Sequence, residues 1–311
     1  MTKIAVLFPG QGAQKVGMGA DFAARFPASR EFFDRADEVL GMPLSRLCFE
    51  GPEADLTLTK NCQPAIYVAS AAIMAALEGA GVLKRSDVVA VAGLSLGEYT
   101  ALYYAGALSF EDGLRLVARR GAYMQEASDA PPSGMVSLLG ADLAQAEAIA
   151  AAAGRGEVLV VANILSPGQI VLSGTKAALE RVPEVAKAHG VRRALPLTVA
   201  GAFHSPLMQP AATRLMEELG RTTLTRPTIP VYGNVTGKAL TDVAEIRSNL
   251  GAQVVRPVLW QQSMTAIGAL GIDLYVEPGP GKVLAGLLKK IDATAATRNF
   301  DSVAELAATA G

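Results

Sequence analysis

Cysteine and histidine, the residues of disulfide frameworks and of many metal sites, are scarce in this sequence. Cysteine occurs twice in 311 residues, at Cys48 and Cys62, and no CxxC motif is present. Two such cysteines can form neither a disulfide framework nor a cysteine zinc site. Histidine also occurs twice, at His189 and His204, without an HExxH motif. We therefore expect no metal site.

An excess of charge of one sign and long apolar runs are missing as well. The chain carries 28 lysines and arginines against 29 aspartates and glutamates, a net charge of −1. Proteins that bind nucleic acid or anionic membranes usually carry a basic excess, so neither partner is expected. No run reaches the ~18 apolar residues of a membrane span. The apolar run 4–8 ends at Pro9-Gly10, too early for a signal-peptide core, so we expect a cytoplasmic protein.

Apolar residues are abundant. Half of the residues are hydrophobic and only 18% are charged, which excludes a disordered chain. At roughly 150 residues per domain, the length predicts two domains or one large domain with an insertion.

Short apolar strands alternate with helical patterns along most of the chain. This alternation predicts parallel βαβ units and an α/β fold. We expect strands at 4–8, 88–92, 225–234 and 274–277, and helices at 22–40, 65–77, 98–108, 110–126 and 250–270. Pro64 is expected just before its helix, where proline suits a first turn.

The segment 129–198 has a different pattern, β-α-β-β-α-β, which is typical of a ferredoxin-like unit. Its strands are predicted at 135–139, 158–163, 169–173 and 194–199, and its helices at 143–153 and 176–189. We therefore predict a small ferredoxin-like subdomain, 129–198, inserted between the two parts, 1–128 and 199–311, of a large α/β subdomain with a parallel sheet.

A candidate nucleophile lies in the motif G-x-S-x-G at 93–97, between an expected strand and an expected helix. On such a sharp turn the backbone of Ser95 is strained, and small flanking residues relieve the crowding. The amide that follows the serine, at the helix N-terminus, can help to hold an oxyanion. The alternative is an ordinary glycine-rich turn.

A serine nucleophile needs a base, and the chain offers two histidines. His189 ends a predicted helix, where a histidine is usually structural. His204 lies where the predicted insertion rejoins the large subdomain, and ligand clefts form at such seams. No acidic residue closely precedes His204, so the third member of a triad is not readable, and a backbone carbonyl could orient the ring instead.

A candidate anion-binding residue lies on the amphipathic helix predicted at 110–126. Arg120 falls roughly 70° from the centre of its apolar face, whereas Arg119 falls nearly opposite. Arg120 is therefore expected to point inward. Two interpretations stay open: an arginine that snorkels to the surface, or a bidentate clamp on a carboxylate.

Seven motifs, spread over nearly the whole chain, resemble the malonyl-CoA:acyl-carrier-protein transacylases of fatty-acid and polyketide synthesis. That family has a hydrolase-like α/β subdomain with a ferredoxin-like insertion, as predicted above. The motifs, in chain order, are 8–14 (FPGQGAQ), 93–99 (GLSLGEY), 120–126 (RGAYMQE), 163–169 (NILSPGQ), 202–208 (AFHSPLM), 253–260 (QVVRPVLW) and 277–282 (EPGPGK).

The resemblance implies a role for each matching residue. Ser95 would be the nucleophile and His204 the general base, oriented by the main-chain carbonyl of Gln253. The amides of Gln11 and Leu96 would form the oxyanion hole.

The resemblance also implies the substrate. Arg120 would hold the free carboxylate of malonate, and the bulky Phe203 would crowd a methyl branch, which favours malonyl over methylmalonyl. The family usually has histidine before the nucleophile, where this chain has Leu94.

The implied reaction is a ping-pong transfer of malonyl from malonyl-CoA to the phosphopantetheine thiol of acyl carrier protein, through a malonyl ester of Ser95. It uses no metal and no cofactor besides the coenzyme A thioester that is the substrate, and we expect a monomer. Three other interpretations share these motifs: a serine esterase or lysophospholipase, a malonyl-loading subunit of a malonate decarboxylase, and a non-catalytic interaction module.

Overall fold

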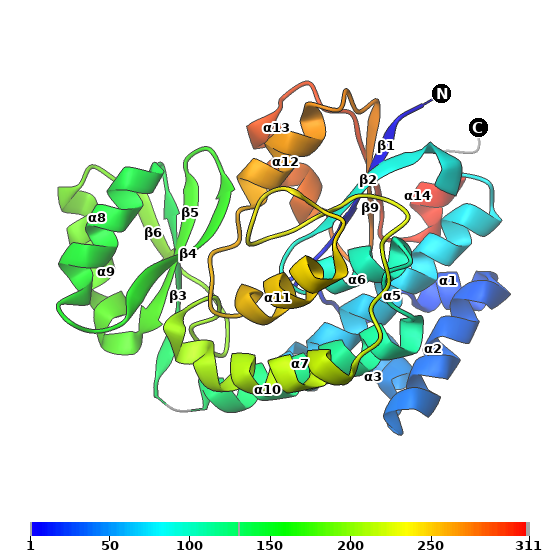
Figure 1. The fold of residues 1–311 in the computed structure, drawn as a ribbon, viewed down its shortest axis with the longest axis horizontal. Coiled ribbons are helices and arrows are strands. Elements are labelled where there is room, and N and C mark those ends of the chain that lie inside the picture. The colour runs from blue at the N-terminus through cyan, green and yellow to red at the C-terminus, as the bar shows by residue number, and fades with distance from the viewer. Residues whose placement is uncertain (1, 130, 309–311) are drawn as a thin grey trace.

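Two β-sheets organise the chain in the computed structural model, which describes residues 2–129 and 131–308 (Figure 1). The larger sheet has six strands in the order β10-β9-β1-β2-β7-β8, and all neighbours are parallel except β7 and β8. Its strands are β1 (Ile4–Phe8), β2 (Val88–Gly93), β7 (Val231–Tyr232), β8 (Ala239–Leu240), β9 (Leu274–Pro278) and β10 (Thr297–Phe300).

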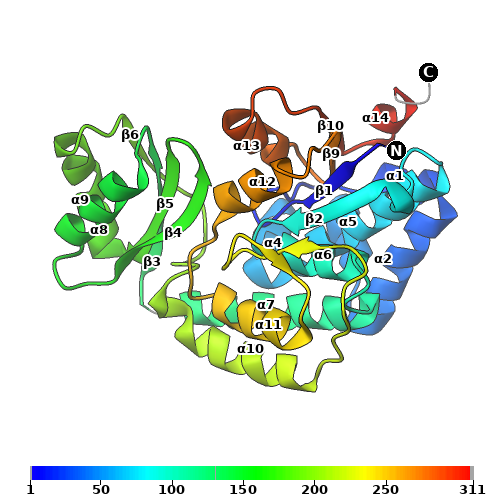
Figure 2. The ribbon, with the colours of Figure 1, turned by 45° about the horizontal axis from the view of Figure 1, so that its top comes forward.

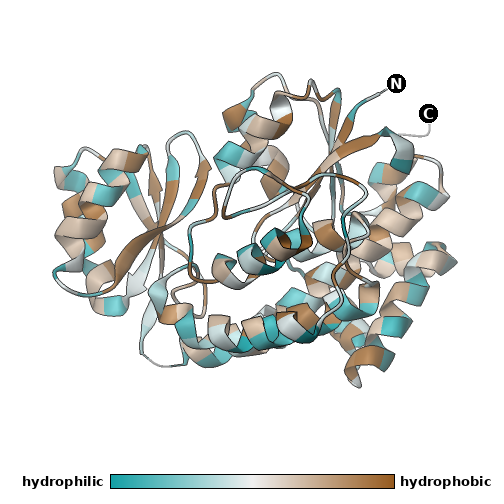
Figure 3. Ribbon diagram, viewed as in Figure 1, coloured by the Kyte–Doolittle hydropathy of each residue, from teal (hydrophilic) through white to brown (hydrophobic). Residues whose placement is uncertain are grey.

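Helices cover both faces of the larger sheet because its central strands are apolar on both sides. Val6 and Phe8 of β1 pack into a cluster with α5 (Thr59–Gly79), α6 (Gly97–Tyr104) and α7 (Phe110–Ser128). Leu7 packs on the opposite face, against α12 (Trp260–Gly268) and α13 (Val283–Ile291). Brown, hydrophobic residues dominate the strands in Figure 3, whereas teal residues interrupt the surrounding helices.

The remaining helices pack outside this core or join its parts. They are α1 (Ala20–Arg25), α2 (Pro27–Leu40), α3 (Leu44–Glu50), α4 (Glu53–Thr57), α10 (Gln209–Arg221), α11 (Val243–Gln253), α14 (Val303–Ala307) and the 3₁₀ turns η1 (Arg85–Asp87) and η2 (Pro206–Met208).

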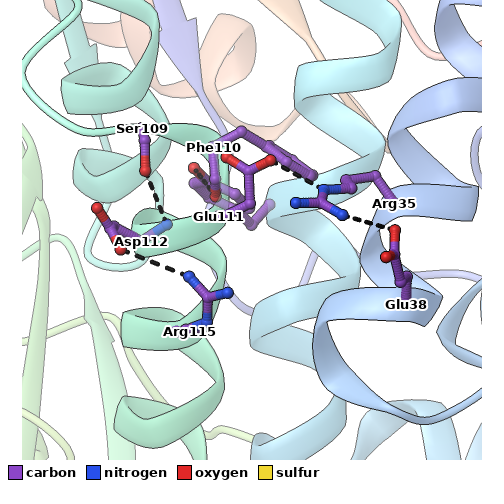
Figure 4. A network of polar contacts seen from close by, with 8 residues as sticks. Arg35, Glu38, Ser109, Phe110, Glu111, Asp112 and Arg115 are labelled. Atoms are coloured by element: carbon purple, nitrogen blue, oxygen red, sulfur yellow. Dashed lines mark hydrogen bonds and ion pairs between the residues drawn. The ribbon is translucent and has the colours of Figure 1, made fainter.

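Polar contacts fix the start of α7 against α2 (Figure 4). The Arg35 guanidinium donates to Glu38 at 2.6 Å and to Glu111 at 2.9 Å. Ser109 caps α7, since its hydroxyl accepts a hydrogen bond from the Asp112 amide at 3.0 Å. Of these contacts, the one between Arg35 and Glu111 joins α2 to α7, the helix that carries Arg120.

The smaller sheet has the strand order β4-β5-β3-β6 with antiparallel neighbours. Its elements are β3 (Ser133–Leu139), α8 (Leu143–Gly154), β4 (Leu159–Ser166), β5 (Gln169–Thr175), α9 (Lys176–Ala188) and β6 (Arg193–Pro196), with a hydrophobic cluster of their own. The predicted α/β fold class is confirmed. The boundaries 1–128, 129–198 and 199–311 stay a prediction.

Backbone hydrogen bonds join the two sheets' units. Val258 donates to the Ala162 carbonyl and accepts from the Ile164 amide, each at 2.9 Å. In Figure 2, α12 and α13 lie on the side of the larger sheet that faces the smaller one, and both helices contact β4. The small sheet is thereby held against the large subdomain at the end where the site forms.

Several predicted elements differ from the observed ones, mostly at prolines. The helix predicted at 22–40 is two helices, because Phe26 is extended before Pro27. The helix predicted at 250–270 is interrupted around Pro257, between α11 and α12. Pro64 lies inside α5, which begins at Thr59, rather than before the helix.

Three further predicted elements are shorter than expected. The helix at 98–108 ends at Tyr104 because Gly106 adopts a φ of 78°. The strand predicted at 225–234 is reduced to Val231–Tyr232, after two prolines. The strand predicted at 194–199 is observed at Arg193–Pro196.

Candidate active site

The turn between β2 and α6 has the strained backbone that is typical of a nucleophile elbow. Ser95 has a φ of 51°, in the left-handed region that non-glycine residues seldom adopt. A Cβ atom on Gly93 would overlap the backbone of Gly97, and one on Gly97 would overlap the Phe8 carbonyl oxygen. The predicted reason for small residues on both sides of the serine is confirmed.

The structure brings Ser95 and His204 together from opposite parts of the chain. Ser95 Oγ lies 2.9 Å from His204 Nε2. His204 Nδ1 lies 2.7 Å from the main-chain oxygen of Gln253. Because that carbonyl only accepts, Nδ1 carries the proton and Nε2 is free to accept the serine proton. His189, by contrast, is exposed at the C-cap of α9.

The environment keeps the His204 ring neutral. Its side chain is buried, and it adopts a φ of 57°. Burial, together with the nearby positive charge of Arg120, lowers the pKa of His204 to about 4, although hydrogen bonds to main-chain carbonyls oppose the shift. A neutral imidazole is the form that can take a proton at neutral pH.

Arg120 points into the site, as its helix position predicts. It is 1% exposed, whereas Arg119 is exposed. Its Nη2 donates to Ser95 Oγ and to Gln253 Oε1, each at 2.9 Å, and its Nη1 donates to Gln63 Oε1 at 2.7 Å. Its Nε is buried without a partner among the described residues. These acceptors are all neutral, and the guanidinium forms no ion pair with a carboxylate within the described part of the chain.

Ser95 and His204 open onto a cavity of about 160 Å³ that both subdomains line. Gln11, Leu94 and Phe203 contribute to its wall from the large subdomain. Apart from Asn163, the other lining residues are not polar: Gly10, Met124, Met135, Leu165, Val171, Leu197 and Val199. Leu94 packs with Leu165 against the apolar cluster around Leu7.

The two residues of the predicted oxyanion hole flank the nucleophile. Gln11 lines the cavity, and its side chain donates to Thr59 Oγ1 at 3.2 Å. Leu96 is buried and is the N-cap of α6. The part that their amides play stays a prediction.

Known proteins share this sequence and arrangement. The family model described as acyl transferase domain matches residues 6–292. The malonyl CoA-acyl carrier protein transacylase of Bacillus subtilis is 43% identical over 296 residues, which cover 94% of this chain and 91% of that protein. The chain belongs to the malonyl CoA-acyl carrier protein transacylase family.

Two further comparisons agree with this family. The transacylase of Salmonella typhimurium is 42% identical, with 99% of both chains covered. A solved malonyl-transacylase, in complex with its type II PKS acyl-carrier protein, matches with a TM-score of 0.94 at 37% identity, with 99% of both chains covered. The resemblance stated from the motifs is confirmed.

Three polar residues of this transacylase-family site were not predicted. Gln63 of α5 holds Arg120, and Glu98 and Asn234 contact the elbow or its partners. Glu98 is an acid on a short apolar helix, and Asn234 follows β7 at the carboxyl edge of the sheet, where ligands of α/β proteins bind. An acid on an apolar helix and a polar residue after a strand can both be seen in the sequence, but neither pattern alone identifies a residue of the site.

In residues 2–129 and 131–308, no cluster of three or more histidine, cysteine, aspartate or glutamate side chains could hold a metal ion. Within the same ranges, no helix is long and apolar enough to cross a membrane. Both cysteines are unpaired and buried.

Proposed function

We propose that this protein transfers malonyl from malonyl-CoA to the phosphopantetheine thiol of acyl carrier protein through an ester on Ser95. The observation that carries the proposal is the geometry at Ser95 Oγ, which lies 2.9 Å both from a neutral histidine nitrogen and from a buried guanidinium. The first contact activates a nucleophile, and the second provides a positive charge for an acid substrate.

The reaction proceeds in two matched halves. Ser95 Oγ attacks the thioester carbonyl while His204 Nε2 takes its proton, and the amides of Gln11 and Leu96 bind the oxyanion. The C–S bond breaks, and the coenzyme A thiolate leaves with the proton from His204. The carrier thiol then gives a proton to His204 and attacks the carbonyl carbon of the malonyl ester. The bond between that carbon and Ser95 Oγ breaks, and His204 returns the proton to Ser95 Oγ.

Selection of malonyl follows from Arg120, which lies beside Ser95, and from Phe203, which lines the cavity. Arg120 binds the free carboxylate of the malonyl group, because its guanidinium lies 2.9 Å from Ser95 Oγ and its hydrogen-bond acceptors are all neutral. Phe203 is 5% exposed and lines the cavity, so it crowds a methyl branch on the acyl group. Monomeric state, cytoplasmic location and independence of bound cofactors stay predictions.

The test is the formation and location of the acyl-enzyme. Purified protein is mixed with malonyl-CoA, its intact mass is measured, and the modified peptide is sequenced, with Ser95→Ala as the control. We expect one malonyl adduct on the peptide that contains Ser95 and none in the variant. An adduct elsewhere, or none at all, would refute the proposal.

A further inference from the structure

A buried carboxyl group lies beside the catalytic residues without touching substrate space. Glu98, in the first turn of α6, is 1% exposed. Its Oε2 accepts a hydrogen bond from Gln253 Nε2 at 2.6 Å and another from the main-chain N–H of Asn234 at 3.1 Å. A buried carboxylate is costly unless it is hydrogen-bonded, and these two bonds offset part of that cost.

The two residues that Glu98 holds contact every reactive group of the site. Gln253 donates from Nε2 to the Ser95 carbonyl at 3.1 Å, accepts at Oε1 from Arg120, and accepts at its main-chain oxygen from His204. The side chain of Asn234 accepts a hydrogen bond at Oδ1 from the main-chain N–H of Ser95 at 2.6 Å. Its Nδ2 donates to the Gly93 carbonyl at 2.7 Å. The elbow, base and guanidinium therefore share one support.

Glu98 also decides which way the Gln253 amide faces. Above its pKa of about 7, Glu98 is a carboxylate, which can only accept hydrogen bonds, as can the Ser95 carbonyl, so the NH₂ end of Gln253 faces both. Its oxygen then faces Arg120, which can only donate. If position 98 offered a donor instead, Gln253 could turn its NH₂ group toward the guanidinium, which would place two donors together.

We propose that Glu98 is a positioning residue for malonyl transfer, which fixes the Gln253 side chain and thereby the place of Arg120 beside Ser95. The inference rests on the proposed function and adds a residue to it.

The charges around Glu98 are consistent with this role. Strands β1 and β2, which pack against α6, carry no ionisable side chain. Arg120 of α7 is the charged group that acts on Glu98, and Tyr99 lies next to it on α6. Burial raises the pKa of Glu98 to about 7, whereas the bonds from Asn234 and Gln253 and the charge of Arg120 lower it.

The test compares Glu98→Gln with Glu277→Gln. Glu277 is an equally buried carboxyl group, 2% exposed, which accepts from the Leu284 and Ala285 amides and from Asn299, away from the elbow. Single-turnover acylation of Ser95 is measured at about pH 8, where Glu98 is ionised, with malonyl-CoA and with acetyl-CoA, and each rate is normalised to the amount of acyl-enzyme that forms.

For Glu98→Gln we expect a malonyl rate about 10- to 100-fold lower, with a smaller loss for acetyl, so that the preference for malonyl narrows. Glu277→Gln is expected to lower thermal stability but to keep both normalised rates. A purely structural role would lower the yield of active protein without changing the ratio of the rates.

Gln253→Leu keeps the main-chain carbonyl for His204 but removes the side-chain link, so it tests the same inference if Glu98→Gln does not fold. It should lower the ratio of the malonyl rate to the acetyl rate in the same way. An unchanged malonyl-to-acetyl ratio in either folded variant overturns the role of Glu98 while the transferase function stands. Failure of the unsubstituted protein to form malonyl-Ser95 would instead refute the function itself.

Discussion

Arg120 is a buried cation whose hydrogen-bond partners are the neutral side chains of Gln63, Gln253 and Ser95. Burial lowers its pKa from the usual value, and a guanidinium still remains charged. A buried charge without a carboxylate partner is unfavourable. Under the proposed function, binding of a substrate carboxylate would relieve that situation, which would account for an arginine beside Ser95.

Replacement of this arginine should therefore change the choice of acyl group. We expect Arg120→Ala to lower malonyl transfer by about 10- to 100-fold, the equivalent of a charged hydrogen-bonded pair of about 1.5–3 kcal/mol. Acetyl transfer should suffer less. Rates with malonyl-CoA and acetyl-CoA measure the effect, and Arg119→Ala on the exposed side of the same helix is the matched control. Equal losses with both donors would contradict the clamp.

Single-residue chemistry was predictable where a local pattern carries it. The G-x-S-x-G turn marks Ser95 as the candidate nucleophile, helix periodicity turns Arg120 inward, and the scarcity of histidine leaves His204 as the candidate base. Glu98 and Asn234 could not be predicted in the same way. Their contacts join residues 136 to 155 positions apart, and only the fold brings those residues together.

At the scale of elements, the site depends on close approach of α6 to the carboxyl ends of β1 and β2. Gly97→Ala would place a methyl group on the Phe8 carbonyl oxygen. We expect destabilisation of about 1–3 kcal/mol, and loss of acylation because the elbow must move. Gly286→Ala, on the exposed side of α13 with no atom nearby, should instead stabilise by up to about 1 kcal/mol.

Chemical denaturation of both glycine variants measures these changes. A Gly97→Ala protein as stable as its parent and fully active would show that the close approach is not required. The two variants are expected to change the free energy of unfolding in opposite directions. That difference separates a steric effect at Gly97 from the general preference of helices for alanine.

Elements were predictable where the pattern is continuous. The apolar runs of β1 and β2, bounded by proline or glycine, were placed within one residue of their observed ends. The breaks at Pro27 and Pro257 were missed because hydrophobic periodicity continues across them, while the backbone before a proline turns to an extended conformation. The pattern thus describes which face is buried but not where the helix stops.

At the scale of the whole molecule, buried Glu98 makes stability depend on pH. The unfolded chain releases this proton near the ordinary pKa of 4.5, and the folded protein holds it until about 7. The contribution of Glu98 to the free energy of unfolding is therefore complete below pH 4.5. About 3 kcal/mol of it is lost as the pH rises through 7.

Glu98→Gln removes this titration. The free energy of unfolding of the variant minus that of the parent should therefore rise by about 2–3 kcal/mol as the pH rises from about 5 to about 8. Urea unfolding of both proteins across that range measures the difference, in which the shared titration of His204 cancels. A difference in stability that is independent of pH would show that Glu98 does not hold its proton as described.

The complete catalytic arrangement exists only in the assembled molecule. The small sheet and the large subdomain both line the cavity above Ser95, and the wall is mostly apolar. Exclusion of water from such a site protects an acyl ester from hydrolysis. The fate of the ester therefore distinguishes a transferase from an esterase with the same elbow.

The central claim is that the malonyl group passes from Ser95 to a carrier thiol. Malonyl-enzyme is prepared, freed of malonyl-CoA and mixed with acyl carrier protein that carries phosphopantetheine, or with the carrier without it as the control. Intact-mass spectra then follow both proteins. We predict that malonyl moves to the phosphopantetheine form alone while the enzyme returns to its unmodified mass. Release as free malonate, with the carrier unloaded, would contradict the account.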